Sequence, residues 1–272
     1  MATLRDDSTQ QHGFESPPAW MTALESRVVA ERLQFEALQP ALRRLRRGDG
    51  HPVIVFPGFA AGDRSTMPLR ELLRDLGYRT YGWGSGVNVG PTQQILDGLV
   101  TRLDGVFERE RRPISLVGWS LGGIYARELA RAFPDRVRQV ITLGSPIQMT
   151  GSDRSRASGM YEALRRYHSP SFSRSEREAR RPLLTVPTTS IYSRTDGIVN
   201  WHSSLIRRTA TSENIRVLGS HCGLGFNATA VYAVADRLAQ PVGSWSPFRP
   251  PWYLRAAFPP VDDLDVGRLP AD

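Results

Sequence analysis

The sequence contains no lysine, so its 35 Lys and Arg positions are all arginines, and the formal charge is +8. A net positive charge of this size raises nucleic acid or an acidic membrane as a partner. The arginines are scattered, however. The densest run, RRLRRG at 43–48, ends a helical pattern, where a basic and solvated last turn is expected. We therefore predict no nucleic-acid partner.

Cysteine and long apolar runs are also scarce. Cys222 is the single cysteine, which excludes an intrachain disulfide framework and offers no cysteine cluster for a metal, so we expect neither a metal nor a cofactor. No apolar run is long enough to span a bilayer, and residues 1–18 are polar and lack the apolar core of a signal peptide. The sequence predicts a soluble cytoplasmic protein. Secretion is the alternative if a signal was removed before residue 1.

Short apolar runs alternate with amphipathic helical patterns along most of the chain, and 40% of all residues are hydrophobic, as in soluble globular domains. This alternation implies right-handed crossovers and a mostly parallel sheet with helices on both faces, which is an α/β fold. Ligands of such sheets bind beyond the carboxyl ends of the strands, so functional residues should follow strands. The predicted strands are 52–59, 78–84, 114–119, 137–146, 188–197 and 214–223, and the predicted helices are 67–77, 91–110, 121–134 and 228–240.

Changes in amino-acid composition along the chain suggest how it divides into segments. We expect a flexible N-terminus (1–18), a helical extension (19–48), a core (49–240) and a Pro/Trp-rich tail (241–272). Residues 147–182, rich in Arg and Ser, interrupt the alternation within the core and are predicted to form a lid; a surface helix packed on the body is the alternative. The tail is predicted to be a strap packed on the body, with a contact to another subunit as the alternative.

A serine stands in the motif Gly118-Trp119-Ser120-Leu121-Gly122, which matches G-x-S-x-G between a predicted strand and a predicted helix. A nucleophile on such a sharp strand-to-helix turn has a strained backbone, and neighbours without a Cβ let the strand and the helix approach each other. The first N–H groups of the helix and its positive dipole end suit a developing oxyanion. We predict Ser120 as a nucleophile, and a structural glycine turn is the alternative.

A nucleophilic serine needs a base and an orienting acid, and with this motif they follow in the order acid, then histidine. Three histidines follow the serine: His168 in the inserted segment, His202 at a predicted helix start, and His221 after a predicted strand in the loop GSHCGLG. The position after a strand favours His221 as the general base, and the other two are interpreted as structural or solvated. Asp196, in the TDG turn that ends the preceding strand, is the predicted acid, with Asp153 as the alternative.

The oxyanion hole is predicted from two backbone N–H groups. Leu121 follows the nucleophile, and Phe59 lies in the loop after the first strand, where Gly58 permits a close approach of the backbone. Cys222, beside the histidine, is interpreted as a small packing residue. Apolar residues near these loops predict a pocket for a hydrophobic or aromatic acyl group, although each of them could equally belong to the core. They are Phe59, Trp83, Trp119, Met149, Trp201, Leu224 and Phe226.

Between about residues 50 and 240, the segments FPGF, GWSLGG, SRTDGIV and SHCGLGFN resemble the bacterial lipase and carboxylesterase branch of the α/β-hydrolase superfamily. The resemblance implies an α/β-hydrolase fold and hydrolysis of small or lipid-like carboxylic esters through an acyl-enzyme. It also implies Ser120 as nucleophile, His221 as general base and acid, and Asp196 as the orienting carboxylate. An acyltransferase or thioesterase with the same three residues is the alternative. A non-catalytic binding module is disfavoured, because no member of this triad is missing.

Overall fold

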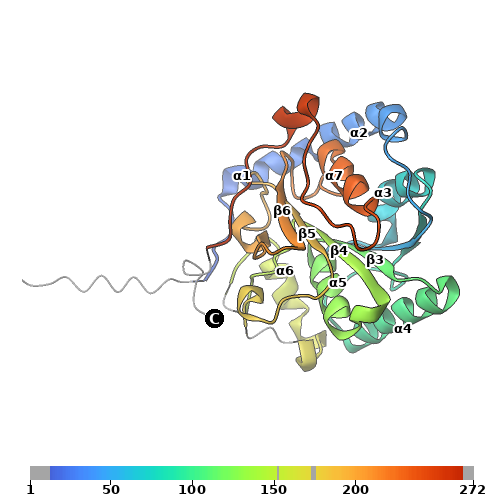
Figure 1. The fold of residues 1–272 in the computed structure, drawn as a ribbon. Coiled ribbons are helices and arrows are strands. Elements are labelled where there is room, and N and C mark those ends of the chain that lie inside the picture. The colour runs from blue at the N-terminus through green and yellow to red at the C-terminus, as the bar shows by residue number, and fades with distance from the viewer. Residues whose placement is uncertain (1–12, 152, 173–175, 266–272) are drawn as a thin grey trace, which may run out of the picture.

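Six parallel strands form the centre of the part of the chain that the structure describes, residues 13–151, 153–172 and 176–265 of a computed structural model (Figure 1). They lie in the order β2-β1-β3-β4-β5-β6, and each neighbouring pair is parallel. The predicted α/β class with a mostly parallel sheet is therefore confirmed. The strands are β1 (Pro52–Phe56), β2 (Arg79–Gly82), β3 (Ile114–Trp119), β4 (Val137–Leu143), β5 (Thr188–Tyr192) and β6 (Ser212–Arg216).

Helices cover both faces of this sheet (Figure 1). α4 (Gln93–Glu110) and α5 (Leu121–Ala132) pack on one face, and α3 (Asp63–Asp75) and α7 (Ala228–Leu238) pack on the other. All five residues of β1 are buried: Val53 and Val55 join the core under α3 and α7, whereas Ile54 and Phe56 join the core under α4 and α5. A strand covered on both faces needs a continuous apolar sequence, which PVIVF supplies.

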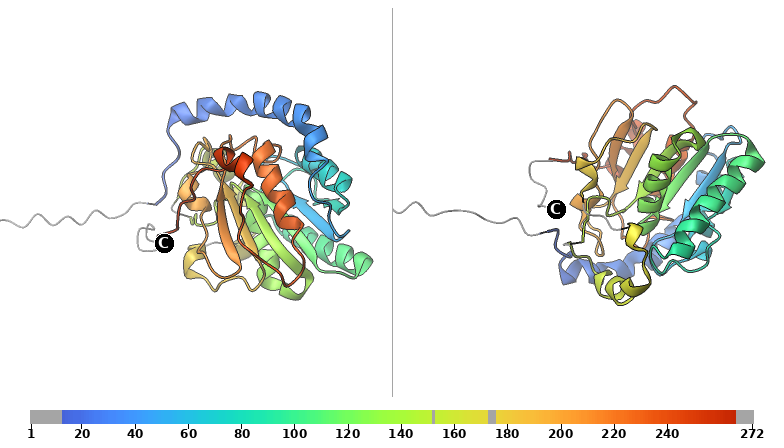
Figure 2. Two further views of the ribbon diagram at one scale, coloured as in Figure 1. Left: turned by 45° about the horizontal axis from the view of Figure 1, so that its top comes forward. Right: turned by 90° about the horizontal axis from the view of Figure 1, so that it is seen from below.

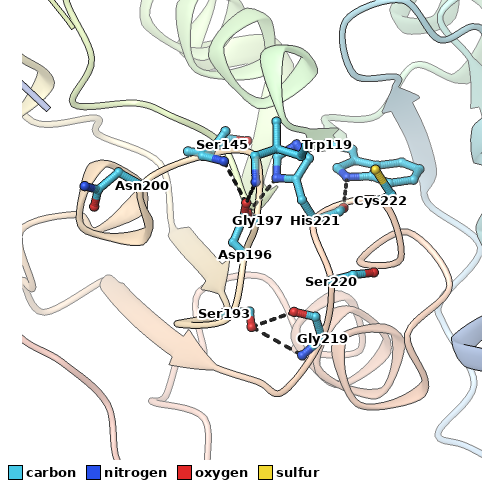
Figure 3. A network of polar contacts seen from close by, with 12 residues as sticks. Trp119, Ser145, Ser193, Asp196, Gly197, Asn200, Gly219, Ser220, His221 and Cys222 are labelled. Carbon is cyan, nitrogen blue, oxygen red and sulfur yellow. Dashed lines mark hydrogen bonds and ion pairs between the residues drawn. The ribbon is translucent and has the colours of Figure 1, made fainter. Parts of the chain in front are cut away.

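β5 and β6 end before the predicted limits at 197 and 223, because side chains take over the backbone pairing there. Ser193 Oγ donates to the carbonyl of Gly219 at 2.7 Å and accepts from the Gly219 N–H at 3.3 Å (Figure 3). Serine hydroxyls compete in this way with the hydrogen bonds of a strand ladder. The chain consequently leaves the sheet in two polar loops, which run from Ser193 and from Val217.

The N-terminal segment forms a curved arm across one end of the molecule (Figure 2). It consists of α1 (Ala19–Ala23), the 3-10 turn η1 (Leu24–Arg27) and α2 (Val28–Leu42). The expected helical character is present, but the buried side chains include two acids, Glu25 and Glu31, beside Phe35 and Leu42, while Leu33 is 63% exposed. The inner side of the arm packs partly against polar loops, so the buried residues of the arm do not follow an apolar stripe.

The segment 147–182 contains α6 (Ser158–Ala163) and the 3-10 turns η3 (Arg165–Tyr167), η4 (Pro170–Phe172) and η5 (Glu178–Arg180). It is attached to the body on both sides of α6: the Arg156 N–H donates to the Ile198 carbonyl at 2.9 Å, and the Ser169 N–H donates to the Pro91 carbonyl at 2.8 Å. Glu178 accepts from Arg127 and Arg131 of α5 at 2.5 Å each, and Arg177 pairs with fully buried Asp153 at 2.7 Å. These contacts fix the residues around η5 to the sheet-covering helix α5.

The tail packs on the outside of α7. Phe248 and Phe258 contact Tyr232 of that helix, with ring centroids 6.3 and 5.9 Å away, and Tyr192 of β5 donates its hydroxyl to Asp262 at 2.7 Å. Trp252 is 79% exposed. The tail includes the 3-10 turn η7 (Trp252–Ala257), and two further 3-10 turns are η2 (Pro134–Arg136) before β4 and η6 (Trp201–Ser204) after β5.

Candidate active site

Ser120 occupies a sharp turn between β3 and α5. Its backbone has φ 53° and ψ −123°, a strained conformation for a residue with a side chain. A Cβ on Gly118 would lie 2.3 Å from Gly123 Cα, and one on Gly122 would lie 2.5 Å from the carbonyl oxygen of Phe56. Both distances are below any real contact, so only glycine fits on either side of the serine. The G-x-S-x-G spacing is thus a steric requirement of this turn.

Asp196 and His221 lie together in the loops that follow β5 and β6 (Figure 3). His221 Nδ1 is 2.6 Å from Asp196 Oδ2, and both side chains are buried. Asp196 Oδ1 also accepts the N–H groups of Ile198 at 2.9 Å and Val199 at 2.7 Å, which fixes the carboxylate. Because Nδ1 donates its proton to Asp196, the lone pair of the imidazole is on Nε2.

Charges around His221 set its proton affinity. Burial alone would lower the pKa of this imidazole, but the carboxylates of Asp196 and Glu25 raise it, and the net result is a pKa above the ordinary value of 6.5. The two negative groups stabilise the imidazolium that would form when the ring takes up a proton. This arrangement suits a histidine that is protonated transiently during a reaction.

Gly144 brings the two loops close to the serine turn. A Cβ on Gly144, which has φ 54°, would lie 3.2 Å from both Asp196 Oδ2 and His221 Nδ1, and the preceding carbonyl of Leu143 accepts the Ser120 N–H at 2.8 Å. Trp119 Nε1 also donates to the His221 carbonyl at 3.0 Å (Figure 3). Within the described residues, Ser120 Oγ and His221 do not form a hydrogen bond.

The predicted oxyanion residues border the same serine. A Cβ on Gly58 would lie 3.2 Å from Ser120 Cβ, so the loop that carries Phe59 touches the turn. Leu121 is the first residue of α5, where a helix leaves its N–H groups unpaired. Asn88, fully buried, fixes the loop: its side chain donates to the Pro57 carbonyl at 3.0 Å, and its backbone carbonyl accepts the Ala60 N–H at 2.8 Å. Asn88 lies outside every motif of the sequence, and no pattern in the sequence predicts this role.

Most of the predicted pocket residues belong to the hydrophobic cores in this structure. Trp83 and Leu224 are 1% and 0% exposed, and Trp119 is 8% exposed. Phe226 packs edge-on against Trp119, whereas Met149 joins a separate cluster with Phe14 and Ala179. Trp201 stacks between Tyr192 and His202. Phe59 is half-buried and contacts Tyr161 of α6, with ring centroids 5.5 Å apart.

The alternative residues have other partners. The His168 ring contacts the Val89 carbonyl at 3.0 Å, and His202 stacks on Trp201. Asp153 is held by Arg177. Cys222 is an exposed residue, but partial burial of its thiol and the neighbouring Glu25 carboxylate raise the pKa of the thiol to about 12, so the thiol stays protonated and is a poor nucleophile.

Among the described residues, no group of three or more His, Cys, Asp or Glu side chains is arranged to hold a metal ion. In the same part of the chain, none of the helices is both long and apolar enough to cross a membrane.

The chain is similar to several known proteins over part of its length. A family model described as a PGAP1-like alpha/beta domain matches residues 90–221. The pimeloyl-[acyl-carrier protein] methyl ester esterase of Shewanella sp. (strain MR-7) is 28% identical over 109 residues, which are 40% of this chain and 40% of that protein. Lipase B of Aspergillus fumigatus aligns with a TM-score of 0.53 and 16% identity over 70% of this chain and 52% of its own. Mouse alpha/beta hydrolase domain-containing protein 10 aligns with a TM-score of 0.49 and 16% identity over 70% of this chain and 88% of its own.

The chain spans 40% of the length of the esterase and 52% of that of the lipase. The likeness to the lipase shows the fold, and the family match contains the strand-to-helix turn of Ser120 and the loop of Asp196 and ends at His221. The chain has the α/β-hydrolase fold, and its residues 90–221 are similar to a PGAP1-like alpha/beta domain.

Proposed function

We propose that this protein is a serine hydrolase that cleaves carboxylic esters through an acyl-enzyme, with Ser120 as nucleophile, His221 as general base and acid, and Asp196 as the orienting carboxylate. The observation that supports this best is the 2.6 Å contact between His221 Nδ1 and Asp196 Oδ2, next to the strained turn of Ser120. A serine hydroxyl is a weak nucleophile by itself. A histidine oriented by a carboxylate is the arrangement that activates it.

In this mechanism, His221 Nε2 takes the proton of Ser120 as Oγ attacks the ester carbonyl. The negative charge that develops on the carbonyl oxygen is stabilised by the N–H groups of Leu121 and Phe59 and by the positive end of the α5 dipole. The imidazolium then donates its proton to the departing alcohol, which leaves the acyl group on Ser120. Water repeats the same steps and releases the acid, while Asp196 stays ionised throughout.

The electrostatics of His221 give this mechanism a pH dependence. The imidazole must be neutral to accept the serine proton, and Asp196 and Glu25 raise its pKa above 6.5. We therefore expect kcat/KM to rise with pH on the acid side, with a midpoint above 6.5.

The proposed substrates are esters of apolar acyl groups. Phe59 and Tyr161 offer apolar surface beside the proposed oxyanion hole. Two similar proteins are a pimeloyl-[acyl-carrier protein] methyl ester esterase and a lipase. Both observations favour an apolar acyl chain over a small charged metabolite.

We propose further that α6 is the part of segment 147–182 that moves, because η5 is tied to α5 through Glu178, Arg127 and Arg131. The Tyr161 ring on α6 packs against Phe59, so displacement of α6 would uncover the oxyanion loop. Rates measured below and above the solubility limit of an ester test this idea. A jump in rate at the limit supports a moving α6, and a smooth curve contradicts it.

Turnover of p-nitrophenyl esters of increasing acyl length tests the proposed function. The wild type should release p-nitrophenolate, and Ser120→Ala should not, although it keeps the same circular dichroism spectrum and thermal midpoint within a few degrees. Added alcohol should compete with water for the acyl group only as a minor path. A product distribution dominated by the new ester would instead indicate an acyltransferase, and equal turnover by Ser120→Ala would refute the nucleophile.

A further inference from the structure

The side chain of Glu25, in the N-terminal arm, connects the two loops that carry Asp196 and His221. Its Oε1 accepts the N–H of Gly197 at 2.8 Å and that of His221 at 2.9 Å, and its Oε2 accepts the N–H of Cys222 at 2.9 Å. The side chain is buried. A carboxylate that accepts three backbone N–H groups from two loops fixes the distance between those loops by strong, charge-assisted hydrogen bonds.

Glu25 is ionised at neutral pH. Burial by itself would raise the pKa of this carboxyl, but the N–H groups of Cys222, His221 and Gly197 lower it, and the net pKa is below the ordinary value of 4.5. The negative charge is therefore permanent under physiological conditions, and the hydrogen bonds to the loops keep their full strength.

Neighbouring side chains of the arm hold the same two loops. Thr22 donates to the Gly197 carbonyl at 2.9 Å. Arg27 donates to the Thr195 carbonyl and to the Gly219 carbonyl, both at 2.6 Å. The arm therefore contacts the loop of Asp196 (the acid loop) and the loop of His221 (the histidine loop) at several points. Of these contacts, those of Glu25 lie nearest to the Asp196–His221 pair.

Glu31 holds the histidine loop alone. Its Oε1 accepts the Ser220 N–H and its Oε2 accepts the Ser220 hydroxyl, each at 2.7 Å. It is buried like Glu25 but makes no bond to the acid loop among the described residues. This difference makes Glu31 a matched control for Glu25.

The two loops have glycines at the positions where they contact the arm. A Cβ on Gly197 would lie 2.3 Å from the carbonyl oxygen of Met21, and a Cβ on Gly223 would lie 1.5 Å from Glu31 Oε2. Any larger residue would displace the arm from the loops. The glycines of TDG and HCG thus serve the contact with the arm in addition to the turns themselves.

We propose that Glu25 is a positioning residue of the active site, which sets the Asp196 loop and the His221 loop at the separation their hydrogen bond requires. The inference rests on the proposed function, in which Asp196 and His221 are the catalytic pair. Catalytic groups work only when they are held close to the productive geometry, and a misplacement of about 1 Å costs about 100-fold in rate. The arm is accordingly part of the active site and not an appended module.

The test compares Glu25→Gln, Glu25→Asp and Glu31→Gln with the wild type in ester turnover as a function of pH. Two charged groups face His221: Asp196, from the loop after β5, and Glu25, from the N-terminal arm. In Glu25→Gln one N–H loses its acceptor and the charge is gone, so kcat should fall about 10- to 100-fold. KM should stay within about threefold, and the acid limb of kcat/KM should move to lower pH.

Glu25→Asp separates geometry from charge. The shorter side chain keeps the negative charge but cannot reach both loops, so kcat should fall while the acid limb stays closer to that of the wild type. Glu31→Gln should lower the thermal midpoint as Glu25→Gln does but leave the acid limb in place. Circular dichroism establishes that each variant is folded; if Glu25→Gln does not fold, Glu25→Asp carries the test.

The inference is overturned if Glu25→Gln and Glu25→Asp both retain wild-type kcat, or if Glu31→Gln reproduces the loss of kcat and the shifted acid limb. Either result would make the arm a stabilising attachment only. A wild type that turns over no ester would instead overturn the proposed function, and the inference with it.

Discussion

His51 should make the stability of this protein fall as the pH drops below neutrality. It is fully buried immediately before β1, where its Nδ1 lies 2.5 Å from Asp49 Oδ1 and its Nε2 lies 2.8 Å from Ser115 Oγ. Burial lowers the pKa of this imidazole to about 4, although Asp49 opposes the shift. The three residues are linked like a catalytic triad, but Ser115 is fully buried within β3 and offers no surface to a substrate.

The lowered pKa of His51 determines the direction in which the free energy of unfolding changes with pH. In the unfolded chain, the imidazole titrates near 6.5, so between pH 6.5 and 4 the unfolded state binds a proton that the folded state does not. The free energy of unfolding should therefore decrease as the pH falls through this window, by about 3 kcal/mol in total. His221 acts in the opposite direction, because its pKa is raised and its contribution is lost as the pH rises.

A His51→Gln variant isolates the contribution of this one residue. Glutamine still offers hydrogen-bonding groups to Asp49 and Ser115 but does not titrate. Urea unfolding of both proteins at several pH values from 7.5 to 4 gives the two free-energy profiles. The wild type should lose about 3 kcal/mol more than the variant across this range. Parallel profiles would refute the reasoning, because they would mean that His51 has the same pKa in the folded and unfolded states.

Three further changes have expected outcomes. Asp196→Asn should lower kcat by about 10⁴-fold with the fold intact, because the amide stabilises the wrong imidazole tautomer; a loss below about tenfold in the ester assay would place the acid elsewhere. Gly122→Ala should cost about 1–3 kcal/mol in urea unfolding and most of the ester turnover, because its Cβ would lie 2.5 Å from the Phe56 carbonyl oxygen. Arg177→Met should cost about 3–5 kcal/mol, because it leaves the Asp153 charge buried without its 2.7 Å partner. Combining it with Asp153→Asn should recover part of that loss, and no recovery would contradict the ion-pair explanation.

The parallel sheet could be predicted from the sequence because it follows from local patterns. The run PVIVF is apolar at every position, as a strand covered on both faces must be, and every residue of β1 is buried. The glycines around Ser120 are likewise local, since they are required by a single turn. The roles of Ser120, Asp196 and His221 stay predictions until the variants are measured.

The parts that the sequence did not reveal depend on contacts between distant segments. Glu25 bonds to Gly197, 172 positions away, and in the sequence it is indistinguishable from a solvated acid on a helix. The early ends of β5 and β6 have the same origin, because Ser193 and Gly219 bond to each other across two loops. Asn88 joins the loops after β1 and β2 through its amide. No periodicity or motif encodes such pairs.

Covalent labelling of Ser120 by a fluorophosphonate, followed by the mass of the intact protein, tests the central proposal most directly. The wild type should gain the mass of one phosphonyl group, and peptide mapping should locate it on Ser120. Ser120→Ala should gain none, and His221→Ala should react far more slowly, because the hydroxyl then lacks its base. An unlabelled wild type, or a label that persists in Ser120→Ala, would contradict the assignment of Ser120 as an activated nucleophile.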